Sequence, residues 1–425
     1  MIYKCPNCNG ALEYNPITDE MECAHCGGGY TVAEMETSQE KVEHTFDKNT
    51  GSEDVLNDGK STRKEATEHN IECEERSEDN QFFNNLETME CKIYTCTSCG
   101  AELVMNENEA ASFCAYCGQP TVVFSRVSNE LKPQSIIPFK ITKEQAVNGV
   151  REYLKDNYFV PNEIKNFSAD KVRGIYVPYW VFDIYYYDQQ LWEAIIEGKN
   201  GTRNVVHYER EAECMFQSLT ADASQNLNNE LSQRLEPYDV RTKKPFEAAY
   251  LSGYYADKYD LDESYMEKYA YLRAKNLFDA EIKQTLPGGV LKYSQPKHSI
   301  KKAEYMLLPA WFVTFRYNYE TYTIALNGQN GKIVGTVPFD KKKVIGLYLT
   351  IAVIASVLIT LIIMIGVDGS VESLFGMLPV NVILFILFGF TTYKLRDMLL
   401  QIKYTTNLTK SYQTADYVQE RQDRD

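Results

Sequence analysis

Alternation of apolar, aromatic and polar residues is the main pattern in the middle of the chain. Between Val172 and Phe216 it coincides with many tyrosine and β-branched residues, which predicts β-strands. The run Gly-Lys-Asn-Gly at 198–201 interrupts this stretch and predicts a turn between two strands. A second pair of strands is predicted at 305–317 and 319–337, where the two Asn-Gly pairs within 327–331 supply turn chemistry.

Helical signals flank these strands. Thr142, followed three residues later by Gln145, forms a capping box and predicts a helix that reaches about residue 157. Two more helices are predicted at 222–235 and 262–284. Together these elements predict one folded α+β domain over 131–340, and it is rich in tyrosine, of which the 425-residue chain has 31.

Two uncharged apolar segments follow this domain. Residues 344–367 and 373–393 carry no charged side chain. A helix over the first segment would be about 36 Å long, enough to cross a hydrocarbon core of about 30 Å. We therefore expect a transmembrane helical hairpin within 341–400 and a polar tail at 401–425, with a re-entrant segment as the alternative for the second span.

The flanking charges predict the orientation of this hairpin. The first span is preceded by Lys341, Lys342 and Lys343, and the second is followed by Lys394, Arg396 and Lys403. The loop between the spans is acidic, with Asp368 and Glu372. By the positive-inside rule, both termini are expected to be cytoplasmic and the protein to lie in the cell membrane with two spans. The spans contain no ionisable side chain, so they are expected to anchor the protein and to conduct nothing.

The formal net charge is −15, and most of it lies in one segment. Residues 34–90 hold 17 acidic against 6 basic residues. With so few apolar side chains, this stretch is typical of a disordered acidic linker, which we place at 34–91. An acidic docking segment is the alternative.

Paired cysteines give the strongest chemical signal. The two C-x2-C pairs of residues 1–33 are separated by 14 residues, and the same spacing recurs in residues 92–130. This pattern predicts two zinc ribbons, each with a closed, structural four-cysteine Zn²⁺ site. The predicted ligands are Cys5, Cys8, Cys23 and Cys26 in the first ribbon, and Cys96, Cys99, Cys114 and Cys117 in the second.

Other features of the cysteines agree with this interpretation. The residues after the second cysteine of each pair are Asn9, Gly27, Gly100 and Gly118, types that tolerate the positive φ expected at such a turn. No apolar secretory signal opens the chain, so the eleven cysteines are expected to be reduced. Iron or redox-active thiols are the alternatives to zinc.

Several function classes find little support. Residues 1–33 contain one lysine against four acidic residues, and residues 92–118 one against three, which opposes nucleic-acid binding by the ribbons. Alternating His207, Glu209, Glu211 and Glu213 would line one strand face, as a solvated surface or, alternatively, a cation site. Residues 328–332 lack the spacing of a phosphate loop. No catalytic set is evident, and we expect no enzyme, although a cleft within 131–340 remains the alternative.

Four further segments carry a family resemblance: SIIPFK at 135–140, GIYVPYWVFD at 174–183, YLSGY at 250–254 and NGQNGK at 327–332. With the cysteine pairs, they resemble bacterial TFIIB-type zinc-ribbon membrane proteins, sometimes labelled primosomal helicase-like. The resemblance implies partners among phage-shock-type and flotillin-like (SPFH) membrane-stress proteins. It supplies no catalytic residues, and the chain has no helicase motor.

The expected fold is an α+β multidomain protein with two N-terminal four-cysteine zinc ribbons, a Tyr-rich cytosolic domain and a C-terminal two-helix transmembrane hairpin. The expected function is that of a membrane-anchored adaptor, whose ribbons recruit protein partners at the lipid bilayer. Nucleic-acid binding by the ribbons, in replication or transcription, is the alternative function.

Overall fold

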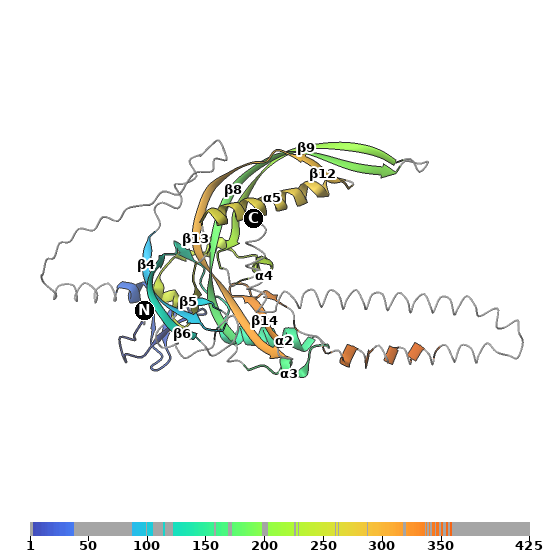
Figure 1. Cartoon of the computed structure of the whole chain (residues 1–425). Coiled ribbons are helices and arrows are strands. Elements are labelled where there is room, and N and C mark those ends of the chain that lie inside the picture. Colours follow the sequence, from blue (N-terminus) through green and yellow to red (C-terminus); the bar gives the residue numbers. More distant parts are fainter. Residues whose placement is uncertain are drawn as a thin grey trace, which may run out of the picture.

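Two β-sheets organise the described part of the protein (Figure 1). The computed structural model describes residues 3–37, 87–98, 100–104, 114, 122–156, 159–168, 172–197, 203–224, 227, 229–259, 261, 263–286, 288–317, 320–335 and scattered positions between 337 and 358. One sheet has three strands and lies in the first cysteine module, and the other has 12 strands and takes in nearly everything else.

The strands are β1 (Leu12–Asn15), β2 (Glu20–Cys23), β3 (Gly29–Tyr30), β4 (Thr88–Cys96), β5 (Glu102–Val104), β6 (Val122–Leu131), β7 (Ser135–Ile136), β8 (Val172–Glu197), β9 (Arg203–Asp222), β10 (Lys244–Pro245), β11 (Tyr255–Asp257), β12 (Val290–Ser294), β13 (Lys297–Tyr317), β14 (Glu320–Asn327) and β15 (Ile333–Val334). The helices are α2 (Lys143–Asp156), α3 (Asn162–Lys165), α4 (Asn229–Leu235) and α5 (Glu263–Gln284), with 3-10 turns η4 (Val240–Thr242) and η5 (Ala248–Leu251).

Strand β8 is the spine of the large sheet. It has 26 residues and would span about 85 Å if fully extended. Strand β13 pairs with it antiparallel along one edge, and β9 pairs with it along the other. The remaining strands extend the order β10-β7-β13-β8-β11-β5-β4-β6, so strands of the second cysteine module belong to the same sheet as the rest.

Most of the predicted secondary structure between 131 and 340 is confirmed. Helix α2 begins after Thr142, whose hydroxyl accepts a hydrogen bond from the backbone N–H of Gln145, as a capping box requires. Helix α5 coincides with the predicted 262–284, whereas α4 begins later than predicted. Residues 327–331 form a turn between β14 and β15, closed by a hydrogen bond from the Gly331 N–H to the Asn327 carbonyl.

The distal parts of β8, β9 and β12, together with α5, form a projection that we call the arm: residues 184–197, 203–216, 263–284 and 290–294. Figure 1 shows the arm curving away from the rest of the sheet. At its base, β9 has a bulge opposite Asp183 of β8, and β13 has a bulge against β8 at the same level. Bulges bend and twist the strands that contain them, so two at one level account for the bend of the arm.

The expected α+β fold with a transmembrane hairpin is wrong. The protein is mostly β-sheet, because the predicted strands belong to the long strands β8, β9 and β13 of one 12-stranded sheet. In the portion of the chain that the structure describes, no helix is long and apolar enough to cross a membrane. This finding contradicts the prediction of a two-span protein of the cell membrane with cytoplasmic termini.

The two segments behind that expectation are barely described. Only scattered positions of 344–367 are placed, and 373–393 lies outside the described residues. An uncharged stretch of 24 residues is long enough for a span. It does not establish one, because apolar helices also pack against protein, and periodicity does not separate the two cases.

An ion cluster around the buried Glu304 joins β7 and β13 to Lys243, which follows η4, and gives a testable pH dependence. Burial alone would raise the pKa of Glu304, but hydrogen bonds from Lys243, Lys302 and Ser135 outweigh it and lower the pKa from 4.5 to about 2. Because the pKa is lower in the folded state, the stabilisation is complete above about pH 4.5 and is lost as the pH falls towards 2.

We therefore expect Glu304→Gln to lower the free energy of unfolding by about 2–3 kcal/mol at pH 7 and by nearly nothing at pH 2. Urea titrations at a series of pH values measure the difference. Glu144→Gln, which neutralises an exposed carboxylate in the first turn of α2, serves as the control and is expected to leave stability nearly unchanged. An equal loss for Glu304→Gln at both pH values would contradict the prediction.

Candidate metal centre

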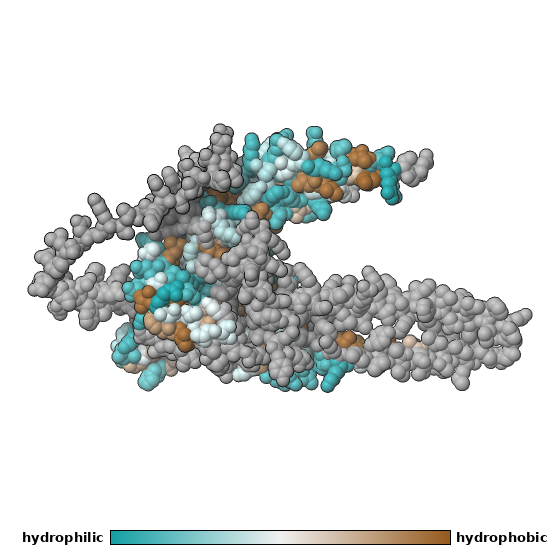
Figure 2. All heavy atoms as spheres, viewed as in Figure 1, coloured by the Kyte–Doolittle hydropathy of each residue, from teal (hydrophilic) through white to brown (hydrophobic). Residues whose placement is uncertain are grey.

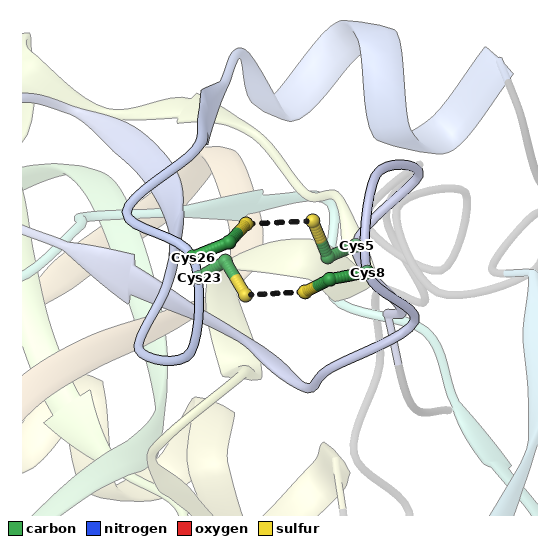
Figure 3. Close-up of side chains that lie close together, drawn as sticks. All are labelled: Cys5, Cys8, Cys23 and Cys26. Carbon is green, nitrogen blue, oxygen red and sulfur yellow. Dashed lines mark hydrogen bonds between the residues drawn. The ribbon is translucent and has the colours of Figure 1, made fainter.

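Four cysteines of the N-terminal module converge on one point (Figure 3). The sulfur atoms of Cys5, Cys8, Cys23 and Cys26 all lie within 4.8 Å of one another. Cys5 and Cys26 are 3.5 Å apart, and Cys8 and Cys23 are 3.4 Å apart. All four are free cysteines, so no disulfide competes for the sulfurs.

These distances fit a tetrahedral metal ion. With Zn–S bonds of about 2.3 Å, the sulfurs of a tetrahedral site lie about 3.8 Å apart, within the observed range. Zinc would be held by Cys5, Cys8, Cys23 and Cys26. Since four protein thiolates complete its coordination, such an ion has no open position for water or substrate. Its chemistry would therefore be structural: it would join the turn of Cys5 and Cys8 to the turn of Cys23 and Cys26.

The backbone builds each half of the cluster as the same turn. The N–H of Asn9 donates to the Cys5 carbonyl, and the N–H of Gly27 donates to the Cys23 carbonyl. Asn9 has φ 61° and Gly27 has φ 71°, which confirms the positive φ predicted at these positions. This left-handed conformation turns the chain back, so that both sulfurs of each pair face the centre of the cluster.

Local hydrogen bonds favour the thiolate form that a metal binds at Cys5 and Cys23. At Cys8 and Cys26, the backbone hydrogen bonds from Gly10 and Gly28 are outweighed by hydrogen bonds among the sulfurs, which raise the pKa of both thiols. The pKa of Cys5 is lowered from 9.0 to about 6, chiefly because the Tyr30 hydroxyl donates a hydrogen bond to its sulfur, 3.4 Å away. The pKa of Cys23 is also lowered, mainly by the backbone N–H of Cys26. Both residues are thereby prepared for metal binding, which requires deprotonated sulfur.

The ribbon is packed against the large sheet through residues 244–254. Tyr14 on β1 makes an edge contact with Tyr250, with ring centroids 5.2 Å apart, and its backbone N–H donates to the Ser252 carbonyl. Lys244 donates to the Asp19 carboxylate at 2.7 Å. A helical turn at 32–37 completes the contact, because Glu36 accepts hydrogen bonds from the Tyr3 hydroxyl and the Ala249 N–H. The ribbon thus shares a hydrophobic core with the sheet.

Aromatic rings carry this contact into the sheet. Tyr254 stacks on Phe139 with ring centroids 4.2 Å apart and approaches Trp311 at 5.9 Å. Its hydroxyl donates to the Tyr14 carbonyl of the ribbon. Gly174 on β8 makes room for the ring, since a Cβ there would lie 2.7 Å from Tyr254. The four-cysteine cluster is therefore attached to the spine of the fold through packed side chains.

The second predicted cluster is only partly described. Cys96 and Cys114 are buried in one hydrophobic cluster, whereas Cys99 and Cys117 lie outside the described residues. The turn after Cys96 has the same form as those of the first ribbon: the Gly100 N–H donates to the Cys96 carbonyl, and Gly100 has φ 78°. Gly118 also lies outside the described residues.

Sequence reasoning missed one residue at the cluster and placed others correctly. Tyr30 was not singled out, although it follows Cys26 by four residues, and its hydroxyl is a ready donor to sulfur. His25 is exposed and does not belong to the four-sulfur group. On β9, His207, Glu209, Glu211 and Glu213 share one exposed face, as their alternation predicted.

Comparison with known proteins adds a relative. No protein-family model matches the chain, and no solved structure matches it. Over 236 residues the chain is 31% identical to the uncharacterized protein YdjG of Bacillus subtilis (strain 168), and the alignment covers 52% of this chain and 69% of YdjG. Since this identity extends over more than two thirds of the relative, the chain belongs to the same protein family as YdjG.

Proposed function

We propose that the protein is a non-enzymatic scaffold, which zinc holds in shape and which binds other proteins. Support for a structural metal comes from the four converging cysteines, all of which would be ligands. Because such a site is closed, it offers no position at which a substrate could be activated. The ribbon's packing against the sheet gives the metal a clear role in holding the N-terminal module in place.

The proposal includes a second zinc ion, bound by Cys96, Cys99, Cys114 and Cys117. Its support is the turn at Cys96, which repeats the hydrogen bond and the positive φ of both turns in the first ribbon. Cys114, the third residue of the set, is buried in the same cluster as Cys96. Metal analysis of the purified full-length protein is the direct measurement, with two zinc ions per chain expected.

The exposed apolar surface of the arm carries the protein-binding proposal. Figure 2 shows hydrophobic residues among hydrophilic ones on the arm. Ile195 on β8 and Val205 on β9 are 64% and 55% exposed, and Val290 and Tyr293 on β12 are 65% and 54% exposed. Grouped apolar side chains with a polar surround are typical of protein-interaction surfaces.

Crosslinking in cells tests this proposal. Lys292 on the arm and Lys297, which pairs with Tyr187 of the arm, are exposed and within reach of an amine-specific reagent. We expect mass spectrometry to find crosslinks from these two lysines to discrete partner proteins. Crosslinks from Lys143, exposed at the start of α2, provide the internal control and are expected to be fewer.

Ile195→Ser/Val205→Ser provides the matched variant. It removes two exposed apolar side chains without touching either lysine, and we expect it to reduce the partner crosslinks several-fold. Recovery of nucleic acid without protein partners, after ultraviolet crosslinking of the same cells, would overturn the scaffold proposal in favour of the nucleic-acid alternative.

A further inference from the structure

The arm has one covered and one open face. Helix α5 packs against β8 and β9, and the β8 residues that face it are buried, including Tyr186, Gln190 and Trp192. The alternate residues point to the other face. On β9 the alternation is regular, with exposed residues at odd numbers and half-buried residues at even numbers from 205 to 216.

Strand β9 forms an edge of the arm. Among the residues that the structure describes, β9 pairs with β8 alone. From Ile184 opposite Phe216 to Glu197 opposite Arg203, this pairing runs without a bulge. Residues 203–222 contain no proline or glycine. Natural edge strands are usually blocked by bulges, prolines or covering segments, because free N–H and C=O groups otherwise pair with another strand.

The edge formed by β9 carries a row of negatively charged side chains. Glu209, Glu211 and Glu213 lie in succession on the open face of β9 and are exposed. Tyrosine hydroxyls of β8 hold two of them in place: Tyr185 donates to Glu213 at 2.6 Å, and Tyr187 donates to Glu211 at 2.7 Å. A fixed row of carboxylates therefore runs along the free edge of the sheet.

The row of carboxylates determines which kind of strand can pair with the free edge of β9. Pairing of β9 with β9 of a second copy would bring carboxylates of the two rows close together, which is unfavourable. A strand with lysine or arginine at alternate positions would place its cations opposite Glu209, Glu211 and Glu213. Its intervening side chains would meet the other face of β9, where the half-buried Tyr208 and Ala212 flank Arg210, whose guanidinium already donates to the Thr285 hydroxyl.

We propose that β9 accepts an extended segment of a partner protein as an additional strand, and that this segment alternates basic with apolar residues. The inference rests on the proposed scaffold function, and it names the surface and the chemistry of the partner. Main-chain hydrogen bonds to the free edge supply affinity, and the carboxylate row supplies specificity.

Binding of a synthetic peptide with alternating lysine and valine tests the inference on the full-length, zinc-loaded protein. Isothermal titration calorimetry measures its affinity. We expect E209K/E211K/E213K to weaken binding by about tenfold or more, corresponding to about 1.4 kcal/mol. E144K/E152K/E163K makes the same change of charge at exposed positions of α2 and α3 and is expected to change affinity less than about twofold.

A second peptide separates strand addition from charge attraction. Proline in place of valine keeps every lysine but removes the alternate N–H donors, so we expect its binding to be about tenfold weaker. Hydrogen exchange supplies an independent readout: the lysine–valine peptide is expected to slow amide exchange in residues 203–216. Equal weakening by both triple variants, or equal binding of both peptides, would overturn the inference.

The scaffold proposal can fail separately. If cellular crosslinks at Lys292 and Lys297 persist in E209K/E211K/E213K, a partner binds the arm without using β9, and only the strand inference is lost. If the wild-type protein gives no partner crosslinks while the peptide binds, the edge is competent for an added strand and the scaffold function is lost.

Discussion

Replacing Cys23 by serine is expected to release one zinc ion per chain and to unfold residues 3–37. The strands of this module have only four, four and two residues, too few to hold a sheet together without metal. Structural zinc contributes about 10–16 kcal/mol to such modules. Zinc content by mass spectrometry and limited proteolysis within 3–37 measure the two effects.

Cys214→Ser is the matched control for this experiment. Cys214 lies on β9, away from the sulfur cluster, so the same chemical change is expected to leave both zinc content and proteolysis unchanged. Exposure of Tyr250, on which the ribbon packs, is expected to accompany the loss of metal. If Cys23→Ser retained its full zinc content, the assignment of the cluster as a metal site would fail.

Replacing Arg273 by methionine is expected to lower the free energy of unfolding by about 3–5 kcal/mol. Arg273 on α5 donates two hydrogen bonds to the Glu236 carboxylate, at 2.8 and 2.5 Å, and another to the Thr220 carbonyl of β9. Both partners of the ion pair are largely buried. Removing one leaves a buried charge without its partner, which is the costly case. Urea denaturation measures the loss.

The double variant distinguishes this mechanism from lost packing. Arg273→Met/Glu236→Met removes both charges, so we expect it to be more stable than Arg273→Met alone. Lys132→Met breaks the exposed ion pair with Glu87 and is expected to cost less than about 1 kcal/mol. If the double variant were as unstable as the sum of its single changes, the ion pair would not be the cause.

The four-cysteine cluster was predictable because its signals are local. Two C-x2-C pairs at fixed spacing identify Cys5, Cys8, Cys23 and Cys26. The residue after each pair is Asn or Gly, which predicts the positive φ of the turn that brings the two sulfurs of a pair together. A capping box likewise identified the start of α2, because the two side chains involved lie within one helical turn. The wider zinc-ribbon family resemblance stays a prediction.

The sequence did not reveal which strands are neighbours in the large sheet, because those strands are far apart along the chain. Strand β11 pairs parallel with β8 and antiparallel with β5, which joins the second cysteine module to the large sheet. No local pattern specifies such partners, because alternation of apolar residues defines the faces of a strand and leaves its neighbours open. The same limit explains why the predicted transmembrane hairpin had to be corrected. Hydropathy shows that a segment is apolar, but it does not show whether lipid or protein surrounds that segment.

The regular ladder between β8 and β9 has a consequence for changes in chain length. Side chains alternate with a period of two along a strand. If one residue were inserted into β9 between Tyr208 and the base of the arm, every β9 side chain on one side of the insertion would therefore move to the opposite face of the sheet. Carboxylates would then turn towards α5, and Cys214 would turn outwards. We expect relatives of this protein to differ in arm length by even numbers of residues in both strands together, or by changes confined to the connection at 198–202.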